Sequence, residues 1–555
     1  MKLFCTLLLL GWVAAAEERV PLNGGWMFAA VQAQENDLPP ESTRWTPVQV
    51  PHCWPVNLPS PAGRAGWFRR DFAAPARANS HVRIVFDAVF HKTKVWLNGR
   101  YAGDHEGADM PWELDIDPYL QPGNNTVMVS AEAALAVRDV WLLVTPRVYP
   151  QSLRVVATRA DVTGTVWIRN TLENTVNVQV EFSVLEGTRV LARSTAAGTI
   201  PPGLTQDLDT TLHIPNAKLW SIDQPHLYEL RTVVFKSAEA LEGAYESEIR
   251  SHFGIRTVAV RGTELLLNGE PIRLAGVNRG IDPPEFCAIE SDAALDADFR
   301  LMKEAGLEFQ LVGQHPARAH LLDWADRNGM LLIMPVASAD RAKIRQLIEQ
   351  HGNHPSIIAW STEDTCAAAP LVKSLDSTRV ATGTCPAAAD IVSFAHRGDT
   401  VSLEKTVEQM HSRYPGKPLF LSEFGPPPEA PGAARDAAAF LHRAAAVFRM
   451  YSYVAGAALT AFHDAPSLYN EAVRNEFSVL KIQQVSQEHG VTMIEIANRA
   501  GFPHRTARGY QLRVGNQTQP IPELEPGGRA KFEFHSVNPY RVDIVTGTGF
   551  VVADR

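Results

Sequence analysis

Short runs of alternating apolar and polar residues dominate the first 258 positions of the chain. A period of two is typical of strands with one buried face, and turn residues such as Asn98 and Gly99 separate the runs. Residues 17–150 are therefore predicted to form a jelly-roll-like β-sandwich. Residues 151–258 repeat the pattern with strands about every 8–12 residues, which predicts an immunoglobulin-like β-sandwich.

From residue 259 the apolar runs alternate with helical patterns instead. The predicted strands are 271–278, 308–313, 331–336, 357–363, 379–384, 391–396, 418–424 and 456–462. The predicted helices include 292–305, 318–328, 339–349, 403–413 and 434–451. This order over residues 259–483 predicts a (β/α)8 TIM barrel near the lower size limit of that fold, with a doubly wound sheet as the structural alternative.

The two ends of the chain differ from this plan. Residues 484–555 return mostly to period-two patterns and predict a small C-terminal β module. At the other end, Lys2, an apolar run over 3–13 and three alanines at 14–16 are typical of a signal peptide over residues 1–16, with a short buried segment as the alternative. Such a run is too short for a bilayer, which needs about 20 residues. We therefore expect an exported protein, periplasmic or extracellular, without a membrane span.

Composition and charge narrow the class of protein. Charged residues make up 20% and hydrophobic residues 45%, which excludes a disordered chain, a collagen-like rod and a coiled coil. The net charge of −9 is spread along the chain, which argues against a nucleic-acid-binding surface. The sequence has no CxxC motif, no Cys/His cluster and no dense group of oxygen ligands, so we expect neither a metal nor an organic cofactor.

Ordered segments of the sequence resemble motifs of glycoside hydrolase family 2, the β-galactosidase, β-glucuronidase and β-mannosidase family. They are 66–72 (GWFRRDF), 95–99 (VWLNG) with Gly103 and His105, 138–142 (RDVWL), 219–221 (LWS), 225–228 (PHLY), 253–256 (FGIR), 267–271 (LNGEP), 276–279 (GVNR) and 354–361 (HPSIIAWS). The resemblance covers about residues 20–480. It implies action on β-linked glycosides by a retaining mechanism.

The resemblance also implies two catalytic carboxyl groups, on strands four and seven of the barrel. Strand seven keeps its residue, because Glu423 in LFLSEFG occupies the nucleophile position; a structural carboxylate paired with a nearby arginine is the alternative. Strand four has Thr365 where the family has its acid/base glutamate, and a threonine cannot supply a carboxyl proton. The candidate substitutes are Glu363 and Asp364, with solvated or salt-bridged loop acids as the alternative.

Several supporting groups of the family are replaced as well. Gly280 stands in place of the histidine after GVNR, and Leu311 stands in place of an arginine whose charge helps to keep the nucleophile ionised. Thr460 aligns with a tryptophan that floors the sugar subsite, and strand three lacks its acid. An active site that has lost several groups at once indicates impaired chemistry.

Polar residues nevertheless remain at the predicted strand ends. The candidate substrate-binding residues are Asn278, Arg279, Gln314, His315 and Asp464. Two functions fit this set: an exported β-glycosidase with impaired activity, or a non-catalytic carbohydrate-binding or scaffold protein on the same fold. Both predict a carbohydrate as the partner.

Two cysteines follow neighbouring predicted strands of the barrel. Cys366 comes after strand four and Cys385 after strand five, so both are expected on the face where the active site would lie. In an exported protein they could form a disulfide beside Thr365, and two free thiols are the alternative.

Overall fold

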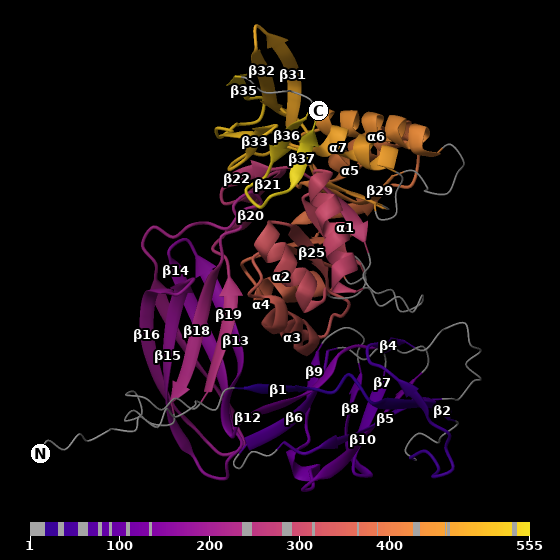
Figure 1. Ribbon diagram of the computed structural model, residues 1–555, viewed down its shortest axis with the longest axis vertical. Coiled ribbons are helices and arrows are strands. Elements are labelled where there is room, and N and C mark those ends of the chain that lie inside the picture. Colours follow the sequence, from indigo (N-terminus) through magenta and orange to yellow (C-terminus); the bar gives the residue numbers. More distant parts are fainter. Residues whose placement is uncertain are drawn as a thin grey trace, which may run out of the picture.

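A computed structural model gives the arrangement of the chain. It describes residues 17–31, 38–53, 65–75, 80–87, 92–106, 111–132, 136–235, 247–279, 291–313, 317–362, 366–385, 387–425, 433–460, 462, 467–535 and 541–554. The N-terminal sandwich and the C-terminal module lie at opposite ends of the molecule, with the second sandwich and the barrel between them (Figure 1). No helix in the described part of the chain is both long and apolar enough to cross a membrane.

The N-terminal region is a sandwich of two main antiparallel sheets. The first has the order β1 (Glu18–Pro21), β12 (Val140–Pro146), β6 (Ser80–Phe86) and β9 (Trp112–Asp115). The second has the order β3 (Thr46–Val48), β2 (Trp26–Val31), β5 (Ala65–Ala73), β10 (Asn124–Glu132), β7 (Lys92–Leu97) and β8 (Arg100–Glu106). A short pair, β4 (His52–Cys53) with β11 (Ala136–Val137), and the 3-10 turn η1 (Asp117–Tyr119) complete it. Phe68, Ile84 and Val127 lie in the apolar core between the sheets.

The second sandwich follows directly. One sheet has the order β13 (Val148–Thr158), β14 (Asp161–Asn170) and β17 (Thr205–His213). The other has the order β16 (Arg189–Ile200), β15 (Val176–Glu186), β18 (Tyr228–Phe235) and β19 (Ser247–Phe253). Strand β14 shows why the pattern works: Val162, Val166 and Ile168 are buried in the core, while Trp167 lies on the opposite face of the sheet.

Eight parallel strands close the barrel, which excludes the doubly wound alternative. They are β23 (Leu274–Arg279), β24 (Phe309–Val312), β25 (Leu331–Pro335), β26 (Ile357–Ser361), β27 (Val380–Gly383), β28 (Ile391–Ala395), β29 (Leu419–Phe424) and β30 (Val454–Leu459). The helices are α1 (Asp292–Glu304), α2 (Ala319–Asn328), α3 (Arg341–His351), α4 (Ala368–Leu375), α5 (Thr400–Arg413), α6 (Ala433–Met450) and α7 (Ser467–Phe477). Side-chain oxygens of Ser291, Asp340 and Asp399 accept the first free amides of α1, α3 and α5, which fixes where these helices begin.

Three expected barrel strands differ from those observed by two or more residues at an end. The expected strand 271–278 is split at Arg273: β22 (Glu270–Ile272) joins a separate sheet with β20 (Val258–Arg261) and β21 (Glu264–Leu267), and only β23 enters the barrel. The break occurs because the backbone of Arg273 pairs with His504 instead, through N–O contacts of 2.8 and 3.0 Å. The strand expected at 357–363 ends at Ser361, and the last barrel strand begins two residues earlier than expected.

The C-terminal module holds two further sheets. One has the order β31 (Leu480–Glu488), β32 (Val491–Asn498) and β35 (Arg529–His535). The other has the order β34 (Gln517–Pro520), β33 (Gln511–Val514), β36 (Val542–Val545) and β37 (Val551–Asp554). The four predicted regions, a jelly-roll-like sandwich, an immunoglobulin-like sandwich, a TIM barrel and a β module, are thus confirmed as the fold class.

Buried arginines frame the base of the barrel, where its strands begin. Arg256 donates to three backbone carbonyls around β26 and β27 at 2.7–3.0 Å, and Arg379 donates to Asp376 at 2.9 Å. Burial lowers the pKa of Arg256 to about 9 and that of Arg273 to about 10. These guanidinium groups replace water as donors to carbonyls that the strand ends leave free.

Arg505 joins three regions of the chain at the same base. Its guanidinium donates to Asp223 of the second sandwich at 2.5 and 2.8 Å and to Glu308 of the barrel at 2.5 and 2.8 Å. Tyr510 adds a hydrogen bond of 2.9 Å to Asp223. Burial alone would lower the pKa of Arg505, but the two carboxylates outweigh it and raise the pKa well above its usual value.

Candidate active site

The mouth is the end of the barrel where its strands finish. An irregularity in β29 turns the carboxylate of Glu423 toward the inside of the barrel at this end. Leu419 and Leu421 pack in the helix-facing core, whereas Phe420 packs inside the barrel. Simple alternation would also turn position 423 toward the helices. However, the register shifts by one residue against both neighbouring strands before Phe424, and Phe424 packs with the helices instead. This β-bulge leaves Glu423 on the inner side of the barrel.

Two side chains hold Glu423, one from just beyond the adjacent strand β28 and one from β23, two strands away around the barrel. Arg397, just beyond β28, places its Nε 2.8 Å and one terminal nitrogen 2.6 Å from Oε2 of Glu423. Asn278 of β23 donates to Oε1 over a longer distance of 3.4 Å. The Glu423 side chain is 21% exposed and that of Arg397 is 77% exposed. One carboxylate oxygen is therefore strongly engaged, and the other retains acceptor capacity toward the barrel mouth.

No sequence motif marks Arg397 as a site residue. It lies on the same edge as Glu423 because the backbone amide of His396 donates to the carbonyl of Glu423 at 2.9 Å. An arginine directly after the sixth predicted strand was the available signal, since the ends of adjacent strands meet at the mouth. The alternative that Glu423 pairs with a nearby arginine describes its observed contact, and that contact leaves a catalytic role open because charged partners also tune nucleophiles.

Asn278 and Arg279 were both expected at the mouth, but they point to opposite sides of β23. Asn278 faces the barrel, where it donates to the carbonyl of Ser422 at 3.1 Å as well as to Glu423. Arg279 is buried on the helix side and forms an ion pair of 2.6 Å with Asp298 of α1. Adjacent residues of a strand cannot share one face, so of these two only Asn278 is placed to contact a ligand beside Glu423.

The structure describes two of the positions where this chain lacks a functional group of the family, Leu311 and Thr460. Leu311 is buried in the apolar interior of the barrel with Phe309 and Ile333, so no charge can reach Glu423 from that position. Thr460 uses its amide and its hydroxyl on the carbonyl of Phe424, at 3.0 and 3.1 Å. Positive charge therefore reaches Glu423 from β28 in this chain, rather than from the strand-two position that the resemblance implied.

The remaining candidates fall outside the described residues. They are the candidate acids Glu363 and Asp364, the acid/base position Thr365, and the expected binding residues Gln314, His315 and Asp464. Among the described residues no group of three His, Cys, Asp or Glu side chains could hold a metal ion.

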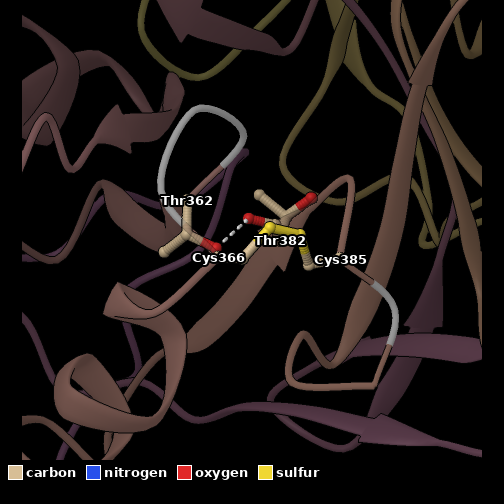
Figure 2. Close-up of a disulfide and its surroundings, with 4 residues drawn as sticks. All are labelled: Thr362, Cys366, Thr382 and Cys385. Atoms are coloured by element: carbon tan, nitrogen blue, oxygen red, sulfur yellow. Dashed lines mark hydrogen bonds between the residues drawn. A yellow bond between two sulfur atoms is a disulfide. The ribbon is translucent and has the colours of Figure 1, made fainter. Parts of the chain in front are cut away.

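Cys366 and Cys385 form a disulfide at the mouth, with Cα atoms 5.5 Å apart (Figure 2). Next to it, Thr362 donates to the carbonyl of Thr382 through its amide at 2.8 Å and its hydroxyl at 3.2 Å. The cross-link therefore continues the pairing of β26 and β27 beyond their last ladder bond. The disulfide excludes the alternative prediction that Cys366 and Cys385 are free thiols.

Comparison with known proteins accounts for this architecture. The sequence model described as "Glycosyl hydrolases family 2, sugar binding domain" matches residues 41–142, and "Glycosyl hydrolases family 2" matches 143–256. "Glycosyl hydrolases family 2, TIM barrel domain" matches residues 258–340. Together these matches cover more than half of the chain. The chain belongs to glycosyl hydrolase family 2. The matched part of the family 2 barrel ends before Thr365 and Glu423.

Relatives within family 2 are distant and longer. A β-galactosidase of Alteromonas mediterranea is 24% identical over an alignment of 430 residues, and the match covers 64% of this chain and 41% of that protein. The chain thus spans less than half the length of the curated relatives it matches. A crystal structure of a Bacteroides uniformis β-glucuronidase superposes with a TM-score of 0.72 at 19% identity, covering 95% of this chain and 78% of that one. A β-galacturonidase of Eisenbergiella tayi bound to galacturonate gives 0.70 at 19% identity, covering 83% and 97%. At such identities these structures establish the fold alone.

Proposed function

We propose that this protein is an exported retaining β-glycosidase that cleaves glycosides with good leaving groups and acts slowly on ordinary ones. The observation that carries the proposal is the inward-facing carboxylate of Glu423, with Arg397 on Oε2 and acceptor capacity left on Oε1. In a retaining mechanism this carboxylate attacks the anomeric carbon, and the bond from that carbon to the leaving oxygen breaks.

Slow turnover of ordinary glycosides is expected because position 365 lacks a proton donor. Family 2 places its proton donor there, and Thr365 cannot protonate a departing alkoxide or later deprotonate the attacking water. Glu363 and Asp364 are the groups of this chain that could take over part of that role. The relatives named for β-galactosidase, β-glucuronidase and β-galacturonidase activity support galactosides and uronides as the first substrates to test.

Dinitrophenyl β-glycosides of galactose and glucuronic acid test the proposal, because dinitrophenolate leaves without protonation. We expect a burst of about one equivalent of dinitrophenolate, a glycosyl adduct on the Glu423 peptide by mass spectrometry, and slow turnover. Azide needs no general base, so it should accelerate turnover and yield a glycosyl azide. The Glu423→Gln variant should lose the burst, and Glu404→Gln, on the outer helix α5, should keep it.

Two results would contradict the proposal. One is the absence of any burst with both sugars, and the other is a burst that persists in Glu423→Gln. If azide has no effect on a substantial turnover, Glu363→Gln and Asp364→Asn then identify which acid serves as the base.

The second candidate function is a non-catalytic carbohydrate-binding protein, and it is favoured because Leu311 and Thr460 stand where the family has an arginine and a tryptophan. It predicts that Glu423→Gln leaves binding of an unhydrolysed glycan unchanged. Export in either case is supported by the disulfide, which persists in oxidising compartments, and by the leader-like residues 1–16.

A further inference from the structure

The turn between β28 and α5 carries Arg397, the arginine that contacts Glu423. It is fixed at its first residue, because the backbone amide of His396 donates to the carbonyl of Glu423 at 2.9 Å. It is fixed at its last residue as well, because the side chain of Asp399 accepts the amide of Ser402 at 2.7 Å and so begins α5. Two residues lie between these anchors, and Arg397 is the first of them.

The imidazole of His396 joins the two anchors to each other. Its Nε2 lies 3.0 Å from the backbone carbonyl oxygen of Asp399 and 3.4 Å from the hydroxyl oxygen of Ser402. A carbonyl can only accept, so Nε2 carries the proton and donates to Asp399. The hydroxyl of Ser402 donates to Oδ1 of Asp399 at 2.7 Å, and the amide and hydroxyl of Ser402 lower the pKa of this carboxyl. His396 is 7% exposed, so its hydrogen bond is largely shielded from water.

The close packing of this turn requires a glycine at position 398. A Cβ on Gly398 would lie 2.7 Å from Oγ of Ser402 and 3.1 Å from Cε1 and Nε2 of the His396 ring. Contacts between non-bonded carbon atoms are otherwise made at about 3.5–4.0 Å. Ser402 could rotate away only by giving up its hydrogen bond to Asp399. The turn therefore wraps closely around the imidazole, which leaves the backbone of Arg397 little freedom.

Capping a helix does not by itself require this arrangement. At α3, Asp340 accepts two backbone amides, and the turn 336–339 before it contains no histidine. The turn before α5 differs because it carries an arginine whose side chain is 77% exposed. An exposed arginine on a loose turn samples many rotamers, and its ion pairs are weak. A fixed turn reduces this cost, because Arg397 gives up fewer conformations when it contacts Oε2 of Glu423.

We propose that His396 and Gly398 are positioning residues, which hold the turn so that the guanidinium of Arg397 stays on Oε2 of Glu423. The inference rests on the proposed function, in which Glu423 is the nucleophile. His396 acts through Arg397, because its imidazole contacts Asp399 and Ser402 rather than the carboxylate. A displaced guanidinium leaves Oε2 without its cation, so attack on the anomeric carbon slows while binding of the sugar is unchanged.

The test follows the dinitrophenolate burst of the full-length protein at increasing substrate concentration, which separates the rate constant of glycosylation from the Kd of the substrate. His396→Phe keeps a ring and removes the donor, and Gly398→Ala adds the Cβ. Each should lower the rate constant by about fivefold or more and leave the Kd unchanged. His396→Gln, whose amide nitrogen can take the place of Nε2, should restore most of the rate. Gly416→Ala, beyond the far end of α5 where a Cβ would meet no atom within 4 Å, is the matched control and should be unaffected.

Two further measurements separate positioning from a general structural defect. If His396 acts through Arg397, His396→Phe should cost no further rate in an Arg397→Ala protein, whereas a structural defect would slow the reaction equally with and without Arg397. Labelling with phenylglyoxal, followed by peptide mass spectrometry, reports on Arg397 without any turnover. Arg397 should react faster in His396→Phe and Gly398→Ala than in the unmodified protein, at a rate close to that in Glu423→Gln.

Two results would overturn the proposal. One is that His396→Phe and Gly398→Ala both leave the burst and the labelling rate unchanged, and the other is that His396→Phe slows the burst equally with and without Arg397. Circular dichroism and the unfolding midpoint identify a variant that does not fold; if Gly398→Ala is such a variant, His396→Phe and its rescue by His396→Gln decide the outcome. An unmodified protein without a burst would contradict the proposed function instead, and the labelling would still show whether His396 and Gly398 hold Arg397 on Glu423.

Discussion

The ion pairs at the base of the barrel are buried, whereas the ion pair at its mouth is exposed to solvent. At the base, Arg505 and its partners Asp223 and Glu308 are each 6% exposed and are joined by short, paired hydrogen bonds. At the mouth, Glu423 is partly exposed and its partner Arg397 extends largely into solvent. A desolvated ion network is costly to break, whereas a solvated pair is cheap to exchange. The base therefore fixes the fold, and the mouth is where groups can be replaced without unfolding it.

The largest effect is expected from breaking the base. Arg505→Met leaves the carboxylates of Asp223 and Glu308 buried without a counter-charge, so it should lower the free energy of unfolding by about 3–5 kcal/mol. Urea unfolding followed by tryptophan fluorescence measures the change. Arg261→Met, which removes an exposed pair with Glu264, is the control and should cost less than about 1 kcal/mol. Equal losses in both variants would show that the base has no special role.

The disulfide is the strongest stabilising feature expected at the mouth. Replacing Cys366 and Cys385 by serine opens a loop whose ends are 19 residues apart, and should cost about 3 kcal/mol. Dithiothreitol should destabilise the unmodified protein by the same amount and leave the double variant unaffected. Alkylation of either cysteine in the native protein without reductant would contradict the cross-link.

A buried histidine at the base should make the protein sensitive to acid. Burial, with the charges of His354 and Arg379, lowers the pKa of His351 to about 3. Below about pH 6.5 the imidazole of His351 binds a proton in the unfolded state but stays neutral in the folded state. The free energy of unfolding therefore falls as the pH drops from 6.5 toward 3, by up to about 1.4 kcal/mol per pH unit. His351→Leu should flatten the dependence of the unfolding midpoint on pH over this window. His252→Leu, on an exposed strand, should leave it unchanged.

The smallest effect on stability is expected at the ion pair of the mouth. Arg397→Ala should change the free energy of unfolding by less than about 1 kcal/mol. In contrast, it should slow the dinitrophenolate burst by about tenfold or more, because Oε2 of Glu423 loses both its hydrogen bond and its ion pair with the guanidinium. Arg397→Lys should restore part of the rate by restoring the charge. Arg413→Ala, at the far end of α5, should leave the rate unchanged, and a similar loss there would point to a non-specific effect.

The periodicity of the sequence predicted the fold because burial acts on every residue of a strand or helix. The alternation of β14 and the apolar runs of the barrel strands each leave many residues in agreement. Local irregularities leave no such signal. The split at Arg273 depends on pairing with His504, which lies far away in the sequence.

The candidate site was predictable only where a motif or a strand end marked it. Glu423 and Asn278 were found in this way, and both face the barrel. Arg279 was placed correctly along its strand, but the alternation of side chains turns it toward α1. Arg397 was missed because no motif carries it, and its role depends on two strands meeting in space.

The bulge in β29 has a consequence for how such a site can change over generations. One extra residue in β29, relative to the strands on either side, turns Glu423 toward the inside of the barrel. Arginine, histidine and tryptophan partners can therefore disappear one at a time while the carboxylate keeps its aim. Descendants of an active enzyme can therefore change from hydrolysis to another use of the barrel mouth and still keep Glu423. Because that residue is kept, single substitutions at the partner positions can also restore the lost groups.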